Sequence, residues 1–214
     1  MPCPFVNVLT RLEFQRRYSA MPKVRKAELI EGVVYIASPV RFRSHAEPHA
    51  NIIGWLGFYS IYTSGTEVAN NATVRLDSGN EVQPDGLLRL RDSKQSRISE
   101  NDLLEGAPEL IVEIAASSAS IDAHDKLKVY RRNQVQEYLI WRVLDGEFDW
   151  FRLKEGKYIQ LEPNAAGIIC SEVFPGLWLD KSALLSGNLN QVLAVLQQGL
   201  ASAEHENFVK QLSN

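Results

Sequence analysis

Two carboxylates stand inside stretches that otherwise read as β-strands. Asp85 follows Pro84 in VQPDGLLRL, residues 82–90, and Glu113 lies in ELIVEIAAS, residues 109–117. Aspartate is depleted from strands, proline is confined to strand edges, starts and bulges, and an ionised carboxylate is costly to bury without a partner. We therefore interpret both acids as residues placed for chemistry rather than for packing.

Acidic side chains that share one site repel each other and lose solvation, and a bound divalent cation removes both problems. Hard carboxylate oxygens favour Mg²⁺, for which Mn²⁺ can substitute. Asp85 and Glu113 are the predicted metal ligands, and Glu28, which opens its own strand, is a third candidate oxygen donor. If the two acidic strands are neighbours, the sequence predicts a magnesium site.

A lysine follows the second acid on a predicted helix. Residues 120–133 place Asp122, Lys126 and Tyr130 four residues apart along one helix face, close enough in the chain to Glu113 to fold back over it. Two acids and a lysine at a metal suit phosphodiester hydrolysis. The metal polarises the phosphate and lowers the pKa of a bound water, and the ammonium group stabilises the developing negative charge.

Each of these residues also has an ordinary structural interpretation. Asp85 could hydrogen-bond a bend that Pro84 introduces, because both residue types favour turns. Glu113 could face solvent at the edge of a sheet. Lys126 could form a helix ion pair with Asp122, worth only about 0.3–0.5 kcal/mol.

A pair of histidines has a spacing compatible with metal binding. His45 and His49 are four residues apart, but they lack the H-E-x-x-H arrangement, and we expect Pro48 to break the helix they would need. We therefore do not predict a zinc site.

The elements that position these residues alternate in type along the chain. Periodicity and turn residues predict a helix over 10–21, strands over 28–30 and 33–37, a helix over 49–62, strands over 66–76 and 81–90, a polar loop over 91–108, and a hairpin through 154–157. Strand 109–117, helix 120–133 and strand 135–143 predict a right-handed crossover with parallel strands. The fold class is α/β (α+β), with a mixed central sheet flanked by helices. We expect residues 1–186 to form one domain and residues 187–214 a C-terminal helix packed on it or on a partner.

The order of the motifs resembles the Uma-two family of restriction-endonuclease-like proteins. The resemblance covers roughly residues 10–180 and rests on these stretches: ELIEG, SPV with a following histidine, VQPDGLL, PELIVEIAAS, D-x-x-x-K-x-x-x-Y and VQEYLIW. It implies the PD-(D/E)XK nuclease fold and a Mg²⁺-dependent endonuclease that hydrolyses DNA. Asp85 matches the family's PD aspartate and Glu113 its strand glutamate. Lys126 matches the lysine that has moved onto the helix, and Glu28 the N-terminal glutamate.

The chain departs from the family pattern at three places. Ala116-Ser117-Ser118-Ala119 stands where Ser-Pro-Ser-Thr is usual, and Arg142 stands where an aspartate is common. Ala115 occupies the position two residues after Glu113, so no E-x-K motif exists within the strand. The nuclease interpretation therefore depends on whether Lys126 reaches the acids.

The resemblance implies that the substrate is DNA, whose sugar-phosphate backbone would contact a local basic face. We expect that face to comprise Arg41, Arg43, Lys128, Arg131 and Arg132. The net charge of −3 argues against a protein whose whole surface binds nucleic acid. This charge, and the lack of a dedicated DNA-binding module, motivate an alternative: a catalytically inactive nuclease-fold protein that acts as a binding or assembly module.

Composition limits the remaining classes of protein to which the chain could belong. The 214 residues are 45% hydrophobic and 23% charged, as in an ordinary globular protein, with no apolar run of about 18 residues and no secretory signal. Cys3 and Cys170 are too few for a disulfide framework, so we expect a cytoplasmic protein that does not enter a membrane. A surplus of aromatic residues is compatible with a homodimer: Trp55, Phe58, Tyr59, Tyr62, Trp150, Phe151, Phe174 and Trp178.

Overall fold

The computed structural model of the protein describes residues 8–36, 39–116 and 121–213, without the side chains of residues 121–123. Cys3 and the departure from the family pattern at residues 117–119 therefore lie outside the described residues.

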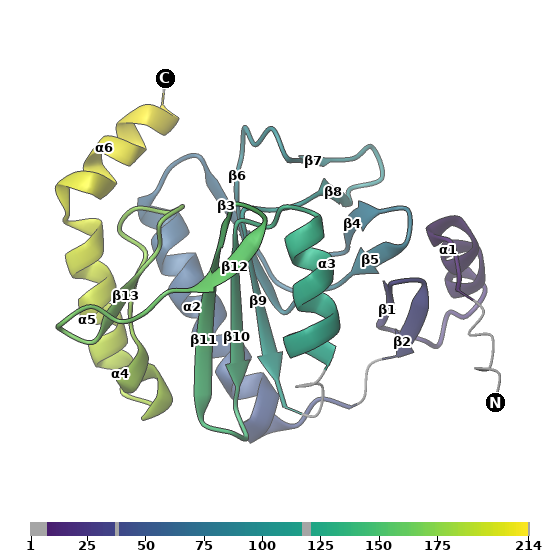
Figure 1. Ribbon diagram of the computed structural model, residues 1–214, viewed down its shortest axis with the longest axis horizontal. Helices are drawn as coiled ribbons and strands as arrows, with labels where there is room; N and C mark the ends of the chain where they lie inside the picture. Colours follow the sequence, from purple (N-terminus) through teal and green to yellow (C-terminus); the bar gives the residue numbers. More distant parts are fainter. Residues whose placement is uncertain (1–7, 37–38, 117–120, 214) are drawn as a thin grey trace.

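A six-stranded mixed sheet forms the centre of the molecule (Figure 1). Its strands lie in the order β12-β11-β10-β9-β6-β3. Their bounds are β3 Thr66–Ala69, β6 Gly86–Leu90, β9 Leu110–Ala115, β10 Glu137–Arg142, β11 Glu147–Lys154 and β12 Lys157–Gln160. β9 and β10 pair in parallel, as the sequence predicted for this crossover, and the other neighbours are antiparallel. The mixed sheet and its flanking helices confirm the predicted fold class.

A second sheet packs beside the first and carries the N-terminal hairpin. Its order is β2-β1-β5-β4-β8-β7. The strands are β1 Ala27–Ile30, β2 Val33–Ile36, β4 Val74–Asp77, β5 Asn80–Val82, β7 Ser96–Ile98 and β8 Leu104–Gly106. The expectation of a polar loop over 91–108 was wrong, because β7 and β8 form a hairpin there. Its polar, largely exposed sequence reflects its place at a sheet edge.

The two strands predicted over 66–76 and 81–90 are each divided between the two sheets. β3 ends at Ala69 before β4 begins, and β5 ends at Val82 before β6 begins at Gly86. Pro84 lies in the second gap, where the chain leaves one sheet for the other. Since proline has no N–H to give to a strand ladder, it suits this crossing and not a strand interior.

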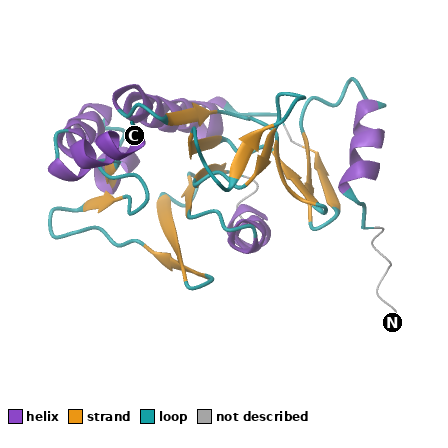
Figure 2. Ribbon diagram, turned by 90° about the horizontal axis from the view of Figure 1, so that it is seen from above, coloured by secondary structure: helices purple, strands orange, loops and turns teal. Residues whose placement is uncertain are grey.

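The central sheet is covered on both faces. α2 (Glu47–Tyr62) and the C-terminal helices pack on one face through a core that includes Leu56, Val112 and Leu196. α3 (Leu127–Arg132) packs on the other face through Ile111 and Tyr130. Figure 1 shows α2 and α3 on opposite sides of strands β9 and β10. In Figure 2, α1 (Arg11–Ser19) and the C-terminal helices lie at opposite ends of the molecule.

The C-terminal segment differs from the single helix that the sequence predicted. It contains α5 (Leu189–Leu200) and α6 (Ala203–Leu212), preceded by the short hairpin β13 (Ile168–Cys170) and β14 (Trp178–Asp180) and by α4 (Lys181–Leu185). Ser202 interrupts the helix because its side chain accepts a hydrogen bond from the backbone N–H of His205 and so caps α6. No helix among the described residues is both long and apolar enough to cross a membrane.

Most of the large aromatic residues are used within the chain itself. Trp55, Tyr59, Trp150 and Phe174 are each no more than 2% exposed and belong to the core beneath α2. They therefore give no support to a homodimer, which stays a prediction.

Candidate active site

Asp85 and Glu113 are neighbours across an antiparallel strand pair. Gly86 pairs with Val112, so Asp85, one residue before, and Glu113, one residue after, come next in register. The backbone N–H of Ile114 donates a 2.8 Å hydrogen bond to Asp85 Oδ2. Both acids are buried, at 4% and 2% exposure. The alternative of a solvent-facing Glu113 was wrong, because β9 lies between β6 and β10 inside the sheet.

Lys126 lies between two of the predicted acids. Its Nζ is 2.9 Å from Glu113 Oε1 and 3.1 Å from Glu28 Oε2, and the side chain is almost fully buried. The Tyr130 hydroxyl donates a 2.6 Å hydrogen bond to the same Glu113 oxygen. Glu28 Oε1 in turn accepts a 2.7 Å hydrogen bond from the backbone N–H of Gln83. The lysine on the helix therefore reaches the strand glutamate.

Asp85 has a separate set of basic partners that the sequence analysis missed. Lys26 Nζ lies 3.6 Å from Asp85 Oδ1, and His45 Nε2 lies 3.3 Å from Oδ2. Burial raises the pKa of Asp85, but the hydrogen bond from His45, the charges of Lys26 and His45 and the Ile114 N–H outweigh it and lower the pKa to about 2. The carboxylate is therefore ionised at neutral pH. Lys26 stands directly before the strand that bears Glu28, but the local sequence does not mark it as a partner of Asp85.

Two π-helical turns place basic side chains beside the acids. η1 (Phe42–Ala46) carries His45, and η2 (Ile121–Lys126) ends in Lys126. π-helical turns are rare and occur often at functional sites. The expectation that Pro48 breaks the helix was wrong, because Pro48 lies in the first turn of α2, where a missing N–H costs nothing.

His49 contacts a different atom of Asp85 from the one that His45 contacts. Its Nε2 lies 2.6 Å from the backbone oxygen of Asp85, so it fixes the main chain beside the carboxylate. The ion pair considered between Lys126 and Asp122 cannot be placed, since the Asp122 side chain lies outside the described residues.

The predicted basic face is partly neutralised. Arg132 donates to both oxygens of Glu31 and contacts Asp77, Arg43 pairs with Glu47 at 2.9 Å, and Lys128 lies 3.8 Å from an aspartate. Arg142, where the family commonly has an aspartate, pairs with Asp149 at 2.8 Å on the neighbouring strand.

The acid cluster brings two carboxylates next to each other in register, those of Asp85 and Glu113. Among residues 8–36, 39–116 and 121–213, no group of three His, Cys, Asp or Glu side chains is arranged to hold a metal. Mg²⁺ in phosphoryl-transfer sites is commonly held by one or two carboxylates, with waters and substrate phosphates completing its shell. Asp85 and Glu113, both oxygen donors and adjacent in register, are of the kind that such a shell requires.

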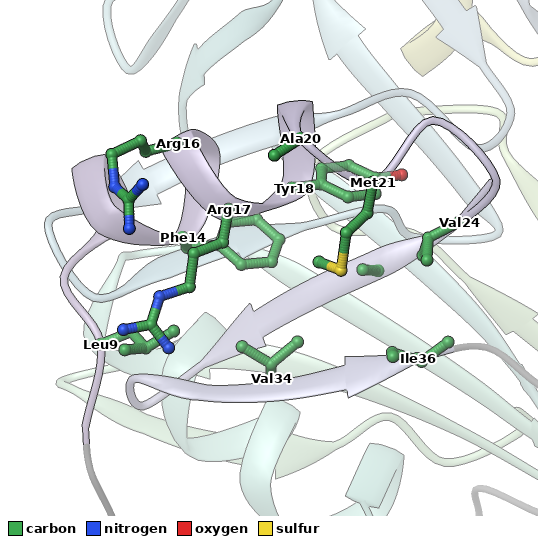
Figure 3. A pocket seen from close by; sticks show the side chains of 11 residues that line it. Leu9, Phe14, Arg16, Arg17, Tyr18, Ala20, Met21, Val24, Val34 and Ile36 are labelled. Carbon is green, nitrogen blue, oxygen red and sulfur yellow. The ribbon is translucent and has the colours of Figure 1, made fainter.

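An apolar pocket lies elsewhere and has a different character. It occupies about 460 Å³ between α1 and the β1–β2 hairpin, and Phe14, Met21 and Val34 are among its lining residues (Figure 3). Its two arginines, Arg16 and Arg17, both pair with Glu13. This pocket presents no carboxylate for hydrolysis, so the acid cluster is the candidate site.

Comparison with known proteins gives the family and the fold of the chain. Residues 12–182 match the Uma2 family, described as "Putative restriction endonuclease". The crystal structure of a "putative nuclease belonging to DUF820" from Anabaena variabilis ATCC 29413 superposes with a TM-score of 0.52. The two share 12% sequence identity over 79% of this chain and 90% of that one, a likeness that shows the fold alone. No curated protein matches the chain. Since the family match spans residues 12–182, which is most of the chain, this chain is a member of the Uma2 family.

Proposed function

We propose that the chain is a Mg²⁺-dependent endonuclease that hydrolyses DNA phosphodiester bonds, with Mn²⁺ as a substitute ion. The observation that carries the proposal is the bridging position of Lys126, 2.9 Å from Glu113 and 3.1 Å from Glu28, beside a second buried and ionised acid, Asp85. A buried lysine between two acids is held in one place, as a catalytic ammonium group must be.

Each residue then has a distinct role. Asp85 and Glu113 would hold the ion, which supplies phosphate polarisation and a more acidic water. Lys126 would donate a hydrogen bond to the attacking water or to a phosphate oxygen as negative charge develops there. Glu28 and Tyr130 would orient the lysine and the glutamate, because each contacts one of them directly.

Two measurements test this proposal. We expect Lys126→Met to lower the rate of plasmid cleavage in Mg²⁺ by about 100-fold, whereas Lys210→Met, which removes an exposed lysine from the C-terminal helix α6, leaves the rate within about twofold. Calorimetric titration with Mn²⁺ should show binding that Asp85→Ala or Glu113→Ala abolishes. Cleavage that persists in Lys126→Met would remove the lysine from the mechanism.

A second candidate keeps the fold without the catalysis. One observation favours it: Lys26 and His45 contact Asp85, and Lys126 contacts both glutamates, so the acids already have basic partners without a metal. Such a protein would act as a binding or assembly module. Absence of Mn²⁺ binding in the wild-type chain, together with retained DNA affinity, would favour this candidate over the enzyme. A homodimer is compatible with either function, and sedimentation at micromolar concentration tests it.

A further inference from the structure

Lys26 and Lys126 differ in how firmly they are held beside the acids. Lys126 Nζ lies 2.9 and 3.1 Å from two glutamates, and its side chain is 4% exposed. Lys26 Nζ lies 3.6 Å from Asp85 Oδ1, too far for a hydrogen bond, and its side chain is 27% exposed. The ammonium group of Lys26 instead donates a 3.1 Å hydrogen bond to a neutral acceptor, Asn71 Oδ1. Of these two lysines, Lys26 therefore has the looser ion pair and the access to solvent.

The two oxygens of Asp85 have different partners. Oδ2 accepts a 2.8 Å hydrogen bond from the backbone N–H of Ile114 and lies 3.3 Å from His45 Nε2. Oδ1 lies near Lys26, and the described part of the chain places no second ion pair or hydrogen bond at this oxygen. Oδ1 is thus the carboxylate oxygen that remains for a metal ion, and Lys26 is the cation already beside it.

A metal ion at Oδ1 and the ammonium group of Lys26 would repel each other. Solvent weakens the repulsion between like charges a few ångström apart but does not remove it. The two cations therefore compete for the same oxygen. Once an ion is bound there, Lys26 needs another anion. The proposed substrate supplies one, because a divalent ion held by one or two carboxylates commonly completes its shell with a substrate phosphate.

We propose that Lys26 is a displaceable counter-ion: it occupies the cation position at Asp85 in the free protein and moves to a DNA phosphate when the metal ion binds. The inference rests on the proposed function and adds to it a residue that couples the metal to the substrate. Such coupling is reciprocal, so DNA and the ion each strengthen the binding of the other.

The chain offers a matched set of variants for this lysine. Lys26→Met and Lys26→Gln both remove the charge, and Lys26→Arg keeps it. Lys23→Met makes the same change in net charge three residues earlier, at an exposed lysine for which the described residues show no ion pair. Unfolding curves of the wild-type chain and the four variants establish that each is folded.

The first experiment is calorimetric titration with Mn²⁺ in the absence of DNA, where cleavage plays no part. We expect Lys26→Met and Lys26→Gln to bind Mn²⁺ about tenfold more tightly than the wild-type chain, because the competing charge is gone. Lys26→Arg and Lys23→Met should remain within about threefold of wild type, since one keeps the charge and the other removes a more distant one. A purely structural role of Lys26 would give the opposite sign, because a disturbed Asp85 would bind the ion more weakly.

The second experiment measures plasmid cleavage at saturating Mg²⁺. Loss of the phosphate contact in Lys26→Met should raise KM about fivefold and leave kcat within about threefold, whereas Lys126→Met lowers kcat. The two lysines would then be separated by the kinetic constant that each one sets.

The outcomes distinguish this inference from the proposed function. Unchanged or weaker Mn²⁺ binding by both neutral Lys26 variants, while Asp85→Ala still abolishes binding, would overturn the counter-ion role and leave the proposed function intact. Mn²⁺ binding that is detectable only in the neutral variants would support the role. If no protein of the set binds Mn²⁺, the proposed function fails and the counter-ion role fails with it. An unchanged KM in Lys26→Met would overturn the contact with phosphate.

Discussion

Two sets of buried carboxylates in and beside the central sheet differ in the kind of partner that they contact. Asp85 and Glu113 contact cations or a histidine: Lys26 and His45 in one case, Lys126 in the other. Glu137, fully buried in the neighbouring strand β10, accepts hydrogen bonds only from neutral donors among its recorded contacts. These are Trp150 Nε1, Ser171 Oγ and the backbone N–H groups of Glu172 and Val173.

The difference distinguishes the candidate site from a structural clamp at Glu137. Neutral donors arranged around Glu137 tie β10 to the loop before Phe174, and burial raises the pKa of this carboxyl although the hydrogen bonds oppose the rise. At Asp85 the order is reversed, since the basic partners outweigh burial. Burial of an acid in a strand is thus no evidence of function by itself. The presence of charged partners is the better criterion.

The largest effect should come from neutralising the site acids without changing their shape. We expect Asp85→Asn and Glu113→Gln each to lower the DNA cleavage rate by about 1,000-fold or more, because the metal would lose one of its two protein ligands. The unfolding free energy should change by much less than in a Glu137 variant, since residues placed for function are commonly not optimal for stability. Cleavage assays and chemical denaturation of the same preparations give both numbers. A variant that loses both stability and activity would contradict the distinction between the candidate site and Glu137.

Glu137→Ala should show the opposite pattern. Its removal leaves the Trp150 indole, the Ser171 hydroxyl and two backbone N–H groups buried without their acceptor, so we expect a loss of about 3 kcal/mol or more in unfolding free energy. Ser171→Ala is the matched variant; it removes one of the four donors to Glu137 and the acceptor of the Phe174 N–H, and should cost less, about 1–2 kcal/mol. Urea denaturation at neutral pH measures both. A Glu137→Ala protein as stable as wild type would mean that water replaces the clamp.

The sequence predicted that Asp85, Glu113 and Lys126 lie close together more accurately than it predicted the elements around them. Asp85 and Glu113 were found because carboxylates contradict the apolar pattern of their strands, and Lys126 because its spacing from Glu113 was matched by the family. Glu137 contradicts a strand pattern in the same way and was overlooked, since no rule from the sequence separates a clamp from a ligand. Burial and partners, which separate them, belong to the fold.

Other features depended on contacts distant in sequence. Nothing local marks Lys26 as a partner of Asp85, because the two are brought together only when β1 and β5 pair. The division of 66–76 and 81–90 between two sheets was hidden for a related reason. Continuous β-propensity shows that residues are extended, but not which sheet they join.

The pH dependence of the unfolding free energy should further distinguish Glu137 from Asp85 and Glu113. Because the folded pKa of Glu137 lies above its usual value near 4.5, the native state binds this proton more tightly than the unfolded state does. Its contribution to stability is complete below pH 4.5 and is lost as the pH rises through the folded pKa. We expect the wild-type chain to lose stability relative to Glu137→Gln over that rise. Urea midpoints from pH 4 to 8 test this, and parallel curves for the two proteins would contradict it.

The smallest effect should come from a third carboxylate arrangement, in which the partner is a cation but water surrounds the pair. Arg132 binds both oxygens of Glu31, at 2.6 and 3.1 Å, yet the two side chains are 53% and 49% exposed. The hydrogen bond from Arg132 lowers the pKa of Glu31, so this contribution is present above pH 4.5 and disappears as the pH falls below it. Solvent screening keeps it small, and we expect Arg132→Ala to cost less than about 1 kcal/mol, with a further decrease in high salt. Arg131→Ala, at the exposed neighbouring position of α3, should cost less still. A loss of unfolding free energy in Arg132→Ala as large as in Glu137→Ala would contradict this expectation. It would show that solvent exposure does not limit the stabilisation from a charged pair.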